Sequence, residues 1–163
     1  MKLLSFAWRS LLAATVCAIA GGVAAQSALI EYRADPETSD AIVVKADQGS
    51  YDPGAGVGRL VGGVEVTSGD IRVRAETGTV HEDPEVPGLA TMLLFEGNVR
   101  VDGPEMDASA DKSTYLVQED LIILEGNVLL SSGRVEMSGE ELTYNTLTRV
   151  ATLGRPSSAS GGN

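Results

Sequence analysis

Residues 122–130 read Ile122-Ile123-Leu124-Glu125-Gly126-Asn127-Val128-Leu129-Leu130, and Phe95-Glu96-Gly97-Asn98-Val99 repeats the centre of that stretch. Leu60-Val61-Gly62-Gly63-Val64 is a third, looser copy of the same step. Apolar residues alternate with other residues on both sides of each step, and this period of two is typical of a β-strand with one buried face. The three copies therefore predict a repetitive all-β fold.

An acidic residue precedes each of these steps. Asp47 precedes Gly62, Glu76 precedes Gly97 and Asp111 precedes Gly126, while Glu140 belongs to an incomplete fourth copy. The interval from acid to Gly is the same in the first and third copies and is longer by six in the second. The repeat is therefore about 29 residues long, a period typical of stacked structural repeats. The six extra residues of the second copy are expected near residues 81–88.

Short polar segments separate the alternating runs. They are Ser68-Gly69-Asp70, Asp102-Gly103-Pro104, Gln118-Glu119-Asp120 and Ser132-Gly133. Connections this short join antiparallel strands, because a parallel crossover needs a dozen or more residues. No stretch after residue 25 shows a convincing helical period. We therefore expect about twelve short antiparallel strands, with unpaired edges on the first, near residues 42–45, and the last, near residues 149–153.

Superposing the repeats predicts which side chains share the inward face of the sheet. The inward residues are Leu60, Val64, Val66, Ile71, Val73, Phe95, Val99, Val101, Met106, Ala108, Ile122, Leu124, Val128, Leu130, Val135 and Met137. The outward residues include Glu65, Arg72, Arg74, Arg100, Asp107, Arg134 and Glu136. A core that packs on itself is the simpler interpretation of the inward set. The scarcity of large aromatic residues and the Gly residues within strands make an apolar groove the alternative.

Residues 1–25 have the pattern of a secretory signal rather than of a folded segment. Lys2 and Arg9 precede an apolar run over residues 11–23, and small residues at 23–25 predict a Sec signal peptide cleaved after Ala25. An uncleaved anchor is the alternative, but 16 residues between Arg9 and Gln26 are fewer than the ~20 of a membrane-spanning helix. Residues 26–40 are expected to be irregular, and the Ser/Gly-rich residues 156–163 to be a disordered tail.

Composition narrows the possible functions. The 163-residue chain has a net charge of −11, which becomes −13 for residues 26–163, so binding to nucleic acid through a basic patch is disfavoured. The one Cys lies within residues 1–25, so the remainder has neither a disulfide nor a catalytic thiol. His81, the one histidine, is expected to be solvated. No cofactor, metal site or catalytic residue is predicted, although the recurring acids leave carboxylate-pair chemistry open.

Residues 41–155 resemble the OstA/LptA-like family of lipopolysaccharide transport proteins. The resemblance rests on residues 42–48, on the thrice-repeated Gly-Gly/Asn-Val step and on the Ala-Asp-x-x-x-Tyr motif at residues 110–115. It implies a twisted antiparallel β-jellyroll that opens into a V-shaped hydrophobic groove. The acyl chains of lipid A would lie in this groove, to which the resemblance adds Ile42 and Val44 beside the inward set.

The resemblance also implies partners and a location. A periplasmic protein of this kind would bridge an LptC-like inner-membrane protein and an LptD-like outer-membrane protein by pairing of strand edges. Copies of the chain could join head to tail in the same way.

Two further functions stay open at this point. One is an LptC-type or orphan OstA-like component of the same pathway, which in the LptC case would retain residues 10–25 as an anchor. The other is an exported β-solenoid enzyme that acts on polysaccharide, which would gather the recurring acids in a cleft. A lipid carrier would place those acids outside an apolar groove.

Overall fold

The computed structural model describes residues 27–35, 41–104, 106–133 and 135–154. The predicted signal peptide and the predicted tail at residues 156–163 lie outside these residues. The described chain forms ten strands and one turn of 3₁₀ helix. They are β1 (Ala28–Arg33), β2 (Ala41–Ala46), β3 (Gln48–Asp52), β4 (Val57–Ser68), β5 (Ile71–Glu82), β6 (Ala90–Asp102), β7 (Asp107–Leu116), η1 (Val117–Glu119), β8 (Leu121–Ser132), β9 (Val135–Asn145) and β10 (Val150–Gly154).

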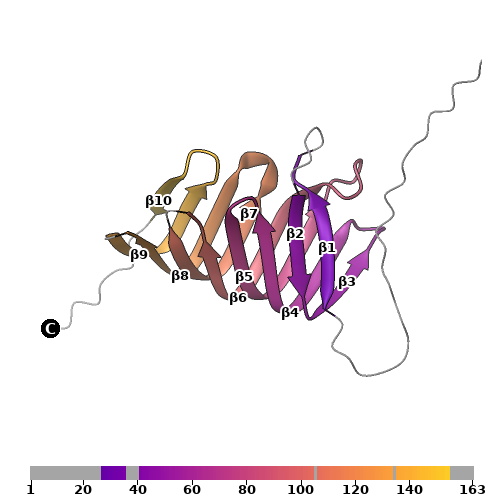
Figure 1. The fold of residues 1–163 in the computed structure, drawn as a ribbon, viewed down its shortest axis with the longest axis horizontal. Coiled ribbons are helices and arrows are strands. Elements are labelled where there is room, and N and C mark those ends of the chain that lie inside the picture. Colours follow the sequence, from indigo (N-terminus) through magenta and orange to yellow (C-terminus); the bar gives the residue numbers. More distant parts are fainter. Residues whose placement is uncertain (1–26, 36–40, 105, 134, 155–163) are drawn as a thin grey trace, which may run out of the picture.

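All strand pairs are antiparallel and belong to one sheet with the order β1-β2-β4-β5-β6-β7-β8-β9-β10, and β3 pairs with β4 beside β2. Figure 1 shows the strands side by side along the long axis, with β1 to β3 at one end and β9 and β10 at the other. Because neighbours from β4 to β10 are consecutive in sequence, short turns are sufficient to connect them. The prediction of an all-β, antiparallel fold is confirmed.

Each long strand is bent near its middle, where its register with the neighbouring strand shifts. The shift between β4 and β5 falls between Val61 and Val64, and the later pairs β5–β6 to β8–β9 have shifts at matching places. As a result, β2 pairs with the second half of β4 and β3 with its first half. The two halves of the long strands form two layers that meet at the bends and face each other across the interior.

The interior between the layers is apolar, and the predicted inward face is confirmed for most of its residues. Apart from Val135 and Met137, every residue expected to line the groove is buried, from Ile42 at 0% to Ile71 at 7% exposed. Met137 is partly buried, whereas Val135 is 54% exposed. Val135 lies two residues before Met137 and so faces the same side of β9. It sits next to the β8–β9 hairpin, however, at the end of its layer, where no further strand of the described chain covers it.

Three expectations about the strands are wrong. There are ten strands in the described chain rather than about twelve, because the alternating runs on both sides of each Gly step join into one bent strand of 10 to 13 residues. Residues 28–33 form β1 and are not irregular. Since β1 pairs with β2 along residues 41–46, the strand near residues 42–45 is not an edge. The expected edge near residues 149–153 corresponds to β10, which ends the sheet order.

Candidate functional site

A row of inward residues crosses the middle strands just beyond the bends. In register these residues are Leu60, Gly78, Phe95, Ser113, Leu124 and Leu142. The large ring of Phe95 stands between the two smallest members, and a Cβ added to Gly78 would lie 3.5 Å from Phe95 Cδ1 and 3.2 Å from Val64 Cγ1. Small neighbours therefore make room for the bulky Phe95 side chain, which is 1% exposed.

The two layers enclose a small cavity near the side opposite the bends. Its volume is about 10 Å³, close to the space of one water molecule. Val66, Ile71 and Val73 line it from one layer, and Tyr115 and Ile122 from the other. The lining is almost wholly apolar, so the contact between the layers is held by dispersion and the hydrophobic effect.

A larger, shallow pocket of about 340 Å³ lies over strands β5 to β8. Thr77, Thr79 and Thr114 line it together with the ion pair between Lys112 Nζ and Glu96 Oε1, which are 2.7 Å apart. This hydrogen bond to Glu96 raises the pKa of Lys112. Leu94 and Phe95 also line this pocket, so its lining is mixed, whereas the lining of the cavity between the layers is apolar.

The recurring acids lie over glycines at the bends. Gly62, Gly97 and Gly126 have φ values of +77°, +84° and +77°, and the next residue of each step also has a positive φ. A Cβ on these glycines would approach Asp47, Glu76 and Asp111 to 2.7, 2.6 and 2.6 Å respectively. The step needs Gly followed by Gly or Asn because both residues adopt the left-handed conformation. The first must be Gly because a carboxylate lies where its Cβ would be.

Side-chain hydrogen bonds reinforce two of these bends. Asn127 Nδ2 donates to Asp111 Oδ2 over 2.7 Å, and Asn98 Nδ2 donates to Glu76 Oε1. All four acids of the repeat, including Glu140, are exposed at the surface. A carboxylate-pair enzyme would need two of these acids to meet in one cleft. The first three acids instead each lie at a separate bend and do not meet.

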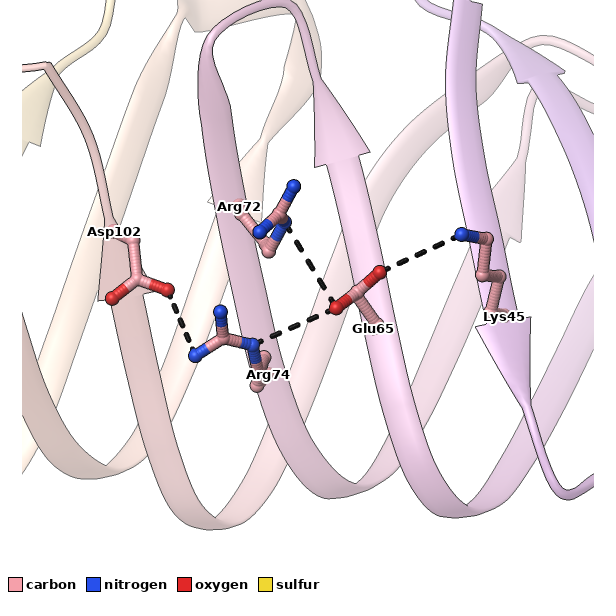
Figure 2. Close-up of polar contacts among 5 residues, drawn as sticks. All are labelled: Lys45, Glu65, Arg72, Arg74 and Asp102. Atoms are coloured by element: carbon pink, nitrogen blue, oxygen red, sulfur yellow. Dashed lines mark ion pairs between the residues drawn. The ribbon is translucent and has the colours of Figure 1, made fainter.

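An ion cluster covers the outward face of strands β2, β4, β5 and β6 (Figure 2). Glu65 lies 3.7 Å from Lys45, 3.9 Å from Arg72 and 3.6 Å from Arg74. Arg74 also pairs with Asp102 over 3.0 Å. Since these side chains are between 30% and 58% exposed, each pair contributes little to stability, about 0–1 kcal/mol. The cluster confirms the outward placement of Glu65, Arg72 and Arg74.

The insert in the second repeat contacts the end of β1. The backbone N–H of Arg33 donates to the Gly88 carbonyl over 2.8 Å, and Arg33 Nη2 donates to the Pro87 carbonyl over 3.4 Å. Glu82 Oε2 accepts hydrogen bonds from Tyr51 Oη and from the Gly88 N–H. The insert therefore covers the last residue of an edge strand, which limits unwanted pairing at that point.

Tyr32 anchors β1 to the opposite layer. It is 4% exposed, and a Cβ on Gly58 of β4 would lie 2.8 Å from its hydroxyl oxygen. Burial, together with the charges of Glu82 and Tyr51, raises the pKa of Tyr32 to about 12. A neutral phenol is thus part of the native packing at this end of the sheet.

Some interior residues were not expected from the sequence. Besides Tyr32, the structure buries Leu93, Tyr115, Leu142 and Tyr144. The period of two in β6, β7 and β9 could have indicated these four, because each has the parity of an inward neighbour. For Tyr32 no comparable repeat was present.

Within the described ranges, no group of three or more His, Cys, Asp or Glu side chains is arranged to hold a metal ion. In the same part of the chain, no helix is long and apolar enough to cross a membrane.

Comparisons with known proteins agree with this geometry. The chain is similar over 75% of its length to LptH of Pseudomonas aeruginosa, described as the LptA-homologous periplasmic component of the lipopolysaccharide transport device. The match has a TM-score of 0.63 and 21% identity, and covers 89% of that chain, so it supports the same fold. A search of curated proteins finds no match. Residues 43–150 match the model of the family described as LptA/(LptD N-terminal domain) LPS transport protein. The chain therefore belongs to the LptA/LptD N-terminal domain family of lipopolysaccharide transport proteins.

Proposed function

We propose that this chain is a periplasmic lipopolysaccharide-binding protein that carries lipid A acyl chains between the two layers of its sheet. The observation that carries the proposal is the apolar interior, which extends from Ile42 in β2 to Leu142 in β9, with the long strands between them all contributing. Family membership and the likeness to a periplasmic transport component support the assignment.

The chemistry of the interior suits acyl chains. Each methylene removed from water contributes about 0.8 kcal/mol, and this requires no charged partner. The net charge of −11 and the acids at the bends repel phosphate groups and favour leaving the headgroup in water. Such binding is apolar and non-directional, which allows a chain to slide along the interior.

Entry of a ligand requires the layers to separate, since the cavity between them is only about 10 Å³. Polar contacts also join the layers on the side opposite the bends. Arg149 Nη2 lies 3.0 Å from Asp70 Oδ2, joining the β9–β10 turn to the β4–β5 turn, and both side chains are about half exposed. Gln118 Nε2 donates to the Ala34 carbonyl over 3.2 Å. Separation would exchange apolar contacts between layers for apolar contacts with the ligand, so its net cost is small.

The same proposal assigns the strand edges to partners. β1 and β10 end the sheet order, and an edge strand can add a strand from another chain through backbone hydrogen bonds. An LptC-like inner-membrane protein and an LptD-like outer-membrane protein would pair with opposite edges, and further copies of this chain would extend the bridge.

Binding of intact and deacylated lipopolysaccharide tests the proposal. The purified protein is mixed with each form, and bound saccharide is measured after gel filtration. Intact lipopolysaccharide should co-elute with the protein, and removal of the acyl chains should abolish co-elution. Equal binding of both forms would show recognition of the saccharide and contradict an acyl carrier.

A further inference from the structure

Ser113 brings a polar side chain into the apolar interior. Among the buried residues of the described chain, it is the only one classed as polar or charged, with 2% exposure. Its register partners on both sides are apolar, Phe95 in β6 and Leu124 in β8. Ser113 also borders the shallow pocket over β5 to β8, but its register partners place its side chain on the inward face. The hydroxyl therefore lies in surroundings where an alanine of nearly the same size would be expected.

The Ser113 hydroxyl has no hydrogen-bond partner within the described structure. Asp102 Oδ2 is the other buried side-chain atom there without a hydrogen bond, but it lies 3.0 Å from Arg74 Nη1 in an ion pair. A buried hydroxyl without a partner costs about 1–3 kcal/mol. Packing around Phe95 explains why residue 113 is small, but it does not explain the hydroxyl.

The position of Ser113 connects it to the space between the layers. Tyr115, two residues later on the same face of β7, lines the small apolar cavity, as does Ile122, which pairs with Tyr115. Ser113 lies one inward position closer to the bend than Tyr115. A ligand that extended this cavity towards the bend would meet the Ser113 hydroxyl next.

We infer that Ser113 is a specificity-determining residue that selects acyl chains carrying an oxygen substituent, such as a hydroxyl or an ester oxygen. This inference rests on the proposed function, because it names the class of acyl chain that the interior accepts. A plain hydrocarbon chain would leave the Ser113 hydroxyl unpaired, whereas a hydroxylated chain would supply the missing hydrogen bond.

The test compares two probes, tetradecanoate and 3-hydroxytetradecanoate, by calorimetric titration of the full chain. The wild type should bind the hydroxylated acid about 3- to 10-fold more tightly, the range expected for one neutral hydrogen bond. Ser113→Ala should bind both acids equally. Thr114→Ala is the matched control, because it removes the neighbouring hydroxyl, which lines the shallow pocket outside, and should retain the preference.

Thermal unfolding of the unliganded variants supplies a second readout. Ser113→Ala should raise Tm by about 3–10 °C, since it removes an unpaired buried hydroxyl that costs about 1–3 kcal/mol. A lower Tm would show that the hydroxyl has a structural partner and would overturn the inference. Equal affinity of the wild type for the two acids would also overturn it while leaving the proposed function intact. Failure to bind either acid would overturn both.

Discussion

Asp111 covers Gly126 at the bend between β7 and β8, so closely that a Cβ on Gly126 would lie 2.6 Å from Asp111 Oδ2. The same pairing joins Asp47 to Gly62 and Glu76 to Gly97. The recurrence of acid and glycine along the sequence therefore reflects two residues that touch in each repeat. One such contact per repeat folds the single sheet into two layers, which in turn creates the interior.

The first prediction concerns this contact. Gly126→Ala should lower the free energy of unfolding by about 2–4 kcal/mol, because it adds a clash with Asp111 to the strain of φ +77°. Gly69→Ala is the control: it has φ +59° with nothing within 4 Å of the added Cβ, and should cost about 1–2 kcal/mol. Urea denaturation measures both, and equal losses would mean that the contact with Asp111 is unimportant.

A second prediction follows from Tyr32. Its pKa is raised to about 12 in the folded protein from 10.0 in the unfolded chain. Its contribution to stability is therefore complete below pH 10 and is lost as the pH rises from 10 towards 12, because the unfolded state ionises first. Between pH 9 and pH 11.5, the free energy of unfolding should fall less for Tyr32→Phe than for the wild type. An identical fall in both proteins would argue against a buried phenol.

The ion cluster around Glu65 should contribute only modestly to the stability of the fold. Glu65→Gln is expected to lower the unfolding free energy by about 0.5–1 kcal/mol at low salt, and by less in 1 M NaCl, where charges are screened within ~3 Å. Glu136→Gln serves as control: it changes an exposed acid of β9 that forms no ion pair with another residue in the described part of the chain, and it should have no measurable effect. A salt-independent loss for Glu65→Gln would point to packing rather than charge.

The edge of β1 offers a test of assembly. Because the Arg33 N–H points away from β2 to Gly88, the N–H groups of Leu29 and Glu31 point to the same open side. Glu31→Pro should remove an edge donor and reduce end-to-end assembly in light scattering while the fold is retained. Ile30→Pro removes a donor to β2 and should instead lower Tm. If Glu31→Pro assembled at the same protein concentrations as the wild type, β1 would be excluded as the edge that joins copies.

Local patterns were sufficient for the antiparallel fold and for most of the inward face, because alternation records burial directly in β4 to β9, but they divided the long bent strands into shorter ones. Other features depend on tertiary contacts. β1 has no repeat that marks it as a strand, and it is held by pairing with β2 and by Tyr32 against Gly58. Val135 has the inward parity but lies where its layer ends, which alternation cannot show. Ser113 reads as an ordinary small residue until its hydroxyl is seen to lack a partner in the described structure.

Leu129 and Leu130 allow the most direct test of the lipid path, because they are neighbours on opposite faces of β8. Leu130 is inward and 3% exposed, whereas Leu129 is outward and 58% exposed. A diazirine analogue of leucine at each position, photolysed in the presence of lipopolysaccharide, preserves the side-chain size and compares the two faces. Lipopolysaccharide adducts are expected at Leu130, and few or none at Leu129. Adducts at Leu129 equal to or above those at Leu130 would contradict a path between the layers.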